Sequence, residues 1–217
     1  MVSYSGNFAT PAPTQLPADQ PWYVWAELKK LPKGKRYPDA EKVLVDSNYA
    51  VDYAKEFVQG RWLEAEENIK KSKKSVEYAI DVIKGRWPEA EEYILKDISL
   101  IINYAKYVIK GRWRNGEYNL LSNPLANIHF ICDYKNEVAI STWPEAEQAI
   151  LKSDARVAWN YTSRCIKNRW PEAEPLILKS VVYTLLYVQN IIKERWPEGE
   201  KTIKKVPKVL FYTPEIS

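Results

Sequence analysis

A short motif recurs through most of this chain and constrains its fold more than any other feature. The clearest copy reads Gly-Arg-Trp-Pro-Glu-Ala-Glu and spans residues 85–91. Each copy is anchored by one aromatic residue, at Tyr37, Trp62, Trp87, Trp113, Trp143, Trp170 and Trp196. Successive anchors lie 25, 25, 26, 30, 27 and 26 residues apart. A period of about 20–50 residues is typical of solenoids built from small supersecondary units.

Two helices are predicted in each repeat. The first runs from Pro88 to Lys96 in the third copy, because proline suits the first helical position and acidic residues favour the first turn. The second runs from Leu100 to Lys110, where apolar residues recur at helical spacing. Gly111 is expected to form its left-handed C-terminal cap. The fold class is therefore all-α, a short α-solenoid of about seven two-helix repeats of about 25 residues each.

Composition divides the chain into three parts. Residues 1–21 contain four prolines and are expected to form an extended N-terminal arm, more typical of a loose tail than of a docked strap. Residues 22–206 form the helical-repeat array, which begins with a short helix over residues 22–31 and contains an irregular unit at 114–143. Residues 207–217, with prolines at 207 and 214, are expected to be a C-terminal cap or tail.

The class of protein follows from charge and hydrophobicity. The chain has 46% hydrophobic residues and a net charge of +4 made of many charges of both signs, which requires neither nucleic acid nor a membrane as partner. No apolar run is long enough for a membrane span, and no signal peptide is recognisable. Cys132 and Cys165 lie in different repeats and suggest no disulfide framework, with Cys165 expected in the core. These features predict a soluble cytoplasmic protein.

Patterns that would indicate catalysis are missing from the sequence. His129 is the single histidine, and a lone histidine does not indicate a metal site. The chain has no glycine-rich phosphate loop and no nucleophile elbow. We therefore expect a non-catalytic protein without a metal or other cofactor.

An arginine precedes most anchors and allows two interpretations. A row of arginines beside aromatic rings could bind the phosphates of a nucleotide or nucleic acid. Alternatively, each arginine pairs with a glutamate of the same or the adjacent repeat and staples the stack, which we favour because residues that recur from unit to unit mostly hold neighbouring repeats together. The residues concerned are Arg36, Arg61, Arg86, Arg112, Arg169 and Arg195.

The irregular unit is where a partner-specific surface is expected. Residues that are fixed in every repeat hold the stack together, so specificity must come from positions that differ between repeats. This unit has the longest spacing, and it replaces the arginine before the anchor with Thr142. An insertion or a bend without a partner is the alternative. The candidate protein-binding residues are Ser122, Asn123, Leu125, Asn127, Ile128 and His129.

The copy at residues 84–91, Lys-Gly-Arg-Trp-Pro-Glu-Ala-Glu, resembles tandem helical repeats of tailed bacteriophage proteins. The resemblance covers about residues 36–204 and implies a phage-encoded accessory protein with a helical-repeat body and no catalytic residues. The expected partner is a host or phage protein, bound in the host cytoplasm. Nucleic-acid or nucleotide-phosphate binding through the arginine edge is one alternative, and a structural role in the virion is another.

Overall fold

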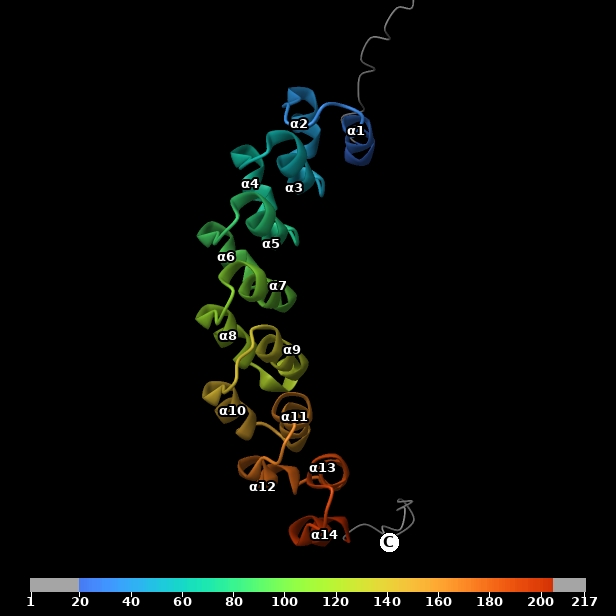
Figure 1. Ribbon diagram of the computed structural model, residues 1–217, viewed down its shortest axis with the longest axis vertical. Coiled ribbons are helices and arrows are strands. Elements are labelled where there is room, and N and C mark those ends of the chain that lie inside the picture. Colours follow the sequence, from blue (N-terminus) through green and yellow to red (C-terminus); the bar gives the residue numbers. More distant parts are fainter. Residues whose placement is uncertain (1–19, 205–217) are drawn as a thin grey trace, which may run out of the picture. The chain divides into compact units, whose positions relative to one another are not determined.

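The computed structural model describes residues 20–204, and over that range the chain is helical without any β-strand. Figure 1 shows the succession of short helices, α1 to α14, along the chain. The all-α prediction is confirmed. Residues 1–19 of the predicted arm and the whole predicted C-terminal cap at 207–217 lie outside the described residues. Pro21, assigned to the arm from its sequence, is instead the first residue of a helix.

Two compact regions divide the chain, one up to Ile94 and one from Leu95 onward. The first contains an initial helix and short helices that follow the anchors at 37, 62 and 87. Neighbouring helices contact each other in the order of the chain, α1 with α2, α3 with α4 and α5 with α6. The helices are α1 Pro21–Leu28, α2 Pro38–Leu44, α3 Ala50–Tyr53, α4 Leu63–Ile69, α5 Ser75–Tyr78 and α6 Pro88–Ile94.

The second region continues the same alternation. Its helix α9 packs against both α7 and α11, and α11 packs against α13. A short 3-10 turn, η5 (Pro171–Ala173), leads into α12. The helices are α7 Ile98–Asn103, α8 Arg114–Leu121, α9 Pro124–Glu137, α10 Pro144–Leu151, α11 Ala155–Tyr161, α12 Glu174–Ile177, α13 Val181–Tyr187 and α14 Pro197–Ile203.

The helix after each anchor begins directly behind the aromatic residue. Proline occupies the first position of α6, α10 and α14, where its missing N–H leaves no hydrogen bond unmade. Two glutamates in the first turn of these helices interact favourably with the helix dipole. The predicted helix at Pro88 begins at that residue and ends at Ile94, two residues earlier than expected.

Most of the second helices end in a π-helical turn. These turns are η1 Ala54–Val58, η2 Ala79–Ile83, η3 Tyr104–Ile109, η4 Thr162–Ile166 and η6 Val188–Ile192. Each is followed by one residue in the left-handed conformation, at Gln59, Lys84, Lys110, Lys167 and Lys193. The prediction that Gly111 forms this cap is therefore wrong, since the preceding Lys110 has φ of 57°. The N–H groups of both Lys110 and Gly111 bond the carbonyl of Ala105, and the left-handed residue is the first of the two.

The irregular repeat differs in its second helix. Asn123 caps α9 by accepting a hydrogen bond from the N–H of Ala126 at 3.2 Å, so α8 and α9 are joined by Ser122 and Asn123 alone. The additional residues lie in this 14-residue helix, not in the surface loop that an insertion predicts. No π turn follows it, and the left-handed residue is Ala139, with φ of 54°.

Candidate functional site

The aromatic anchors form the interior of the repeats. The side chains of Trp62, Trp87 and Trp143 are at most 1% exposed. Each tyrosine nine residues before a tryptophan anchor packs its ring against that tryptophan, with ring centroids 4.9–5.5 Å apart. The tyrosines are fully buried at Tyr53, Tyr78, Tyr104, Tyr134, Tyr161 and Tyr187.

The hydroxyl groups of these tyrosines take part in a recurring cluster with arginine and glutamate. Tyr78 accepts a hydrogen bond from the backbone N–H of Trp62 at 2.7 Å and donates one to Glu66 at 2.9 Å. Arg61 binds both oxygens of the same carboxylate, at 2.8 and 2.7 Å. We name this arrangement the Arg–Glu–Tyr cluster. It recurs at Arg36–Glu41–Tyr53, Arg112–Glu117–Tyr134 and Arg169–Glu174–Tyr187.

The cluster shifts the ionisation of its members. The hydrogen bonds from Arg61 lower the pKa of Glu66, although burial opposes this shift. Burial raises the pKa of Tyr78, and in the last cluster burial raises the pKa of Tyr187 to about 12. At neutral pH the arginine and glutamate are therefore charged and the tyrosine is neutral, which is the state that satisfies all three groups.

In two repeats the arginine before the anchor also approaches a glutamate of the next repeat. Arg36 lies 3.4 Å from Glu64, and Arg112 lies 3.3 Å from Glu145. The Arg112 guanidinium also stands over the Trp143 ring, 6.0 Å from its centroid. The guanidinium of Arg112 is thus held by its own glutamate, by the first glutamate of the following helix and by the next anchor.

These contacts bear on the arginines that could bind phosphate. Arg36, Arg61, Arg86, Arg112, Arg169 and Arg195 each donate to a glutamate five residues later. Bidentate pairing with a carboxylate uses the same fork of donors that would bind a phosphate. A phosphate would therefore have to displace an intramolecular partner and approach its negative charge. The staple interpretation agrees with this geometry.

The structure buries some residues of the predicted protein-binding segment and leaves others exposed. Asn127 is buried and donates to the carbonyl of Leu120 at 3.0 Å, and Ile128 is 1% exposed in the core. Ser122 and Asn123 end one helix and cap the next. Leu125 and His129 remain on the exposed surface, where the side chain of His129 contacts Arg164.

The Arg–Glu–Tyr cluster is interrupted in the repeat anchored by Trp143. Thr142 stands where the other repeats have arginine, so no guanidinium from this position reaches Glu147. Within residues 20–204, the Glu147 side chain has no hydrogen bond or ion pair. The fully buried hydroxyl of Tyr161 is likewise without a hydrogen-bond partner there, although the equivalent hydroxyl of Tyr78 has two.

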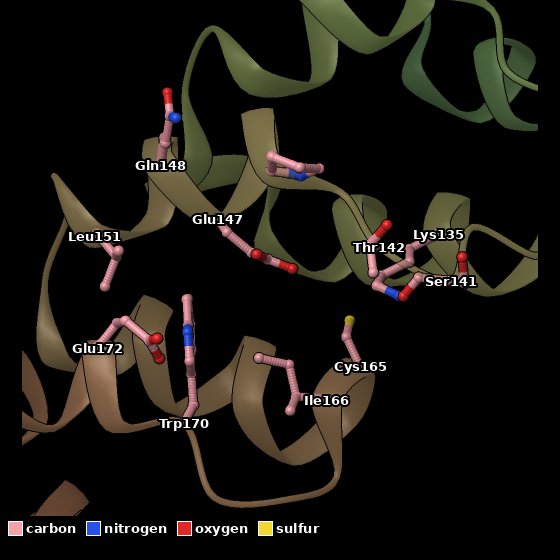
Figure 2. A pocket seen from close by; sticks show the side chains of 11 residues that line it. Lys135, Ser141, Thr142, Glu147, Gln148, Leu151, Cys165, Ile166, Trp170 and Glu172 are labelled. Atoms are coloured by element: carbon pink, nitrogen blue, oxygen red, sulfur yellow. The ribbon is translucent and has the colours of Figure 1, made fainter.

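A cavity of about 510 Å³ lies at this interruption, inside the second region. Figure 2 shows Glu147 extending into it from α10, Trp170 rising from the opposite wall and the thiol of Cys165 pointing toward Thr142. Glu172, the first acidic residue after the next anchor, completes this side of the wall. Thr142 is visible in the sequence as a deviation from the repeat, but the longer spacing predicts a binding site at residues 122–129 instead.

The two cysteines are closer than their sequence positions suggest. Cys132 is buried in α9, and Cys165, in η4, is partly exposed at the cavity wall. A hydrogen bond with Cys165 and burial raise the pKa of the Cys132 thiol. Both cysteines are free, and Cys132 contributes to the core beneath the cavity.

In the described part of the chain, no group of three or more histidine, cysteine, aspartate or glutamate residues is arranged to hold a metal ion. No helix in that part has the length and apolar character needed to span a bilayer. Comparisons of the chain with protein-family models, curated proteins and solved structures find no match.

Proposed function

We propose that this chain is a non-catalytic interaction protein, built as a short α-solenoid of about seven two-helix repeats. The support for the solenoid is the recurrence of the Arg–Glu–Tyr cluster at successive anchors. The contacts between consecutive second helices, α7 with α9 and α9 with α11, support it as well. Stacked repeats of this kind present extended surfaces that bind other proteins.

One observation carries the proposal. In the complete clusters the arginine, glutamate and tyrosine side chains bind one another, whereas beside the cavity the buried hydroxyl of Tyr161 and the partly exposed carboxylate of Glu147 have no hydrogen-bond partner among the described residues. The contrast concerns the clusters alone, since the indole N–H groups of anchors such as Trp62 and Trp113 are also buried without a partner there. A buried polar group without a partner is costly, and a group supplied by a bound protein is one way to satisfy it. The part of the chain available for binding is therefore the repeat that breaks the pattern.

The partner in this proposal is a protein. The cavity carries carboxylates, which repel phosphate, and the arginines of the repeats are already paired with glutamates. Nucleic acid is accordingly a poorer candidate than a protein with basic side chains. From the resemblance of its repeats, we further propose that the chain is a phage-encoded accessory factor that binds a host or phage protein in the host cytoplasm.

The test compares protein and nucleic-acid partners directly. The immobilised full-length chain is incubated with host lysate, with and without nuclease, and each retained protein is purified and bound again by calorimetry. We expect at least one protein to rebind in nuclease-treated samples. Retention that disappears with nuclease, together with DNA affinity that falls about 10³-fold between about 50 and 200 mM salt, would instead identify a nucleic-acid-binding protein.

A further inference from the structure

The surroundings of Arg112 show which groups can hold a guanidinium at this position. Arg112 binds both oxygens of Glu117, each at 2.7 Å. It also approaches Glu145 at 3.3 Å and lies over the ring of Trp143. Two carboxylates and an aromatic face therefore surround one guanidinium. A planar fork of donors above a ring is the geometry in which arginine is most strongly recognised.

The same three groups surround the cavity beside Thr142. Glu147 corresponds to Glu117 by its position four residues after the anchor, and Glu172 corresponds to Glu145 by its position two residues after the next anchor. The next anchor itself is Trp170. All three line the cavity, and the side chain between them is a threonine, too short to reach either carboxylate as an arginine does. The chain thus retains the receptor for a guanidinium but does not supply one.

The buried hydroxyl of Tyr161 differs from the tyrosine hydroxyls of the complete clusters, such as that of Tyr78, which has two hydrogen-bond partners. The hydroxyl of Tyr161 is 0% exposed and has no partner in the described structure. It lies near Glu147 and Cys165, two residues of the cavity wall. In the complete clusters the arginine fixes the glutamate so that its oxygen accepts from the tyrosine hydroxyl. A bound guanidinium would position Glu147 in the same way.

The one cation in the cavity wall does not substitute for the arginine. Lys135 is 7% exposed, and its ammonium donates to the carbonyls of Ile140 and Ser141 at 2.6 and 2.9 Å. Over the described residues Lys135 forms no ion pair with Glu147 or Glu172. The two carboxylates therefore outnumber the single ammonium, and the wall keeps a net negative charge. The volume of the cavity, about 510 Å³, is in the range of small-ligand pockets.

We propose that this cavity binds the guanidinium of an arginine side chain presented by a partner protein, between Glu147, Glu172 and the ring of Trp170. The inference rests on the proposed interaction function and names the chemistry of its partner. The incoming arginine would take the place that Arg112 occupies between Glu117, Glu145 and the ring of Trp143. Lysine is a poorer occupant because an ammonium cannot bind a carboxylate bidentately or stack on a ring as a guanidinium does.

The probe is a short peptide with one arginine, acetyl-Gly-Arg-Gly-amide, titrated into the full-length chain. Binding is followed through the indole N–H resonance of Trp170, which is assigned with a Trp170→Phe variant. Two matched peptides carry lysine or citrulline, the neutral analogue with the shape of arginine. We expect the citrulline peptide to bind about ten- to a hundredfold more weakly, the loss that corresponds to charge-assisted hydrogen bonds. Equal binding of the arginine and citrulline peptides would overturn the proposal.

A variant that fills the cavity with a side chain of the protein itself tests the proposal most directly. Thr142→Arg restores the pattern of the other repeats, so we expect it to abolish peptide binding and raise the melting temperature by about 2–4 °C. Asn168→Arg adds the same charge at an exposed position outside the cavity and should leave peptide binding unchanged. Undiminished peptide binding by the Thr142→Arg chain would contradict the proposal.

A second variant tests the same site without adding a large side chain. Glu172 is exposed, so Glu172→Gln should fold normally and weaken binding of the arginine peptide about tenfold. Unchanged binding in this variant would also overturn the proposal. A protein partner that binds wild type and Thr142→Arg equally would refute the site but leave the interaction function standing. Peptide binding at Trp170 without any protein partner would refute the function but leave the site.

Discussion

The hydroxyl of Tyr78 accepts a hydrogen bond from the backbone N–H of Trp62, 16 residues earlier in the chain, at 2.7 Å. The ring of the same tyrosine packs on Trp87, nine residues later, with the ring centroids 5.1 Å apart. One side chain therefore ties the start of its own repeat to the start of the next. The constant intervals in the sequence reflect this double contact.

Removing that hydroxyl tests the contact, and the chain supplies its own control. Tyr78→Phe leaves the buried N–H of Trp62 without an acceptor, so we expect the free energy of unfolding to fall by about 1–3 kcal/mol. Tyr161 occupies the same position and is equally buried, but its hydroxyl has no partner. Tyr161→Phe should change stability by less than about 0.5 kcal/mol or increase it. Urea denaturation measures both, and equal losses would contradict this account.

The Arg–Glu pair predicts how stability depends on acid. Arg61 lowers the pKa of Glu66 in the folded chain, so this carboxylate stabilises the fold above its unfolded pKa of about 4.3. That contribution is lost as the pH falls through the lowered folded value. Glu66→Gln should reduce the free energy of unfolding by about 1–2 kcal/mol at pH 7, since the arginine is half exposed.

Comparing Glu66→Gln with the wild type at low pH provides an internal control. Once the pH lies below the folded pKa, Glu66 is protonated in the wild type and resembles glutamine in charge and shape. The difference in unfolding free energy between the two proteins should therefore shrink toward zero in acid. A difference that stays constant from pH 7 to strong acid would show that the substitution acts through packing and not through the ion pair.

The anchor tryptophans are predicted to carry much of the packing. Trp62 is 1% exposed, so Trp62→Ala should lower the free energy of unfolding by about 3–5 kcal/mol. Trp22, on α1, is 59% exposed, and Trp22→Ala should change it by no more than about 0.5 kcal/mol. Thermal unfolding followed by circular dichroism compares the two. A small effect at Trp62 would mean that the anchors do not form the core.

Much of the fold is predictable because the same local sequence signals recur in successive repeats. Proline and paired glutamates after each aromatic anchor identify a helix start at Pro88, and the constant tyrosine interval identifies a buried contact. The helix ends are less predictable, since nothing in the sequence distinguishes a π turn from an α turn before Lys110. The length of α9 also could not be predicted from the sequence, because an insertion can extend a helix as well as a loop.

The candidate site was only partly predictable for a related reason. The sequence shows that Thr142 breaks the pattern, but it does not show that Glu172 and Trp170 of the following repeat face the same place. That juxtaposition arises from packing between repeats, which periodicity alone leaves undetermined. The longer spacing predicted that Asn127 and Ile128 bind a partner, but the structure buries both in α9.

The left-handed residue after each π turn provides the last prediction. Lys84 is exposed and has φ of 60°, a conformation that costs a residue with a Cβ atom about 1 kcal/mol and costs glycine little. We expect Lys84→Gly to raise the free energy of unfolding by about 0.5–1 kcal/mol. Gly85→Ala should also raise it, by about 0.4–1 kcal/mol, because a Cβ there meets no atom within 4 Å and φ is not in the left-handed range. If Gly85 were instead the left-handed cap that the sequence alone suggests, Gly85→Ala would lower stability. The sign of this single change, measured by urea denaturation, decides which of the two residues terminates the helix.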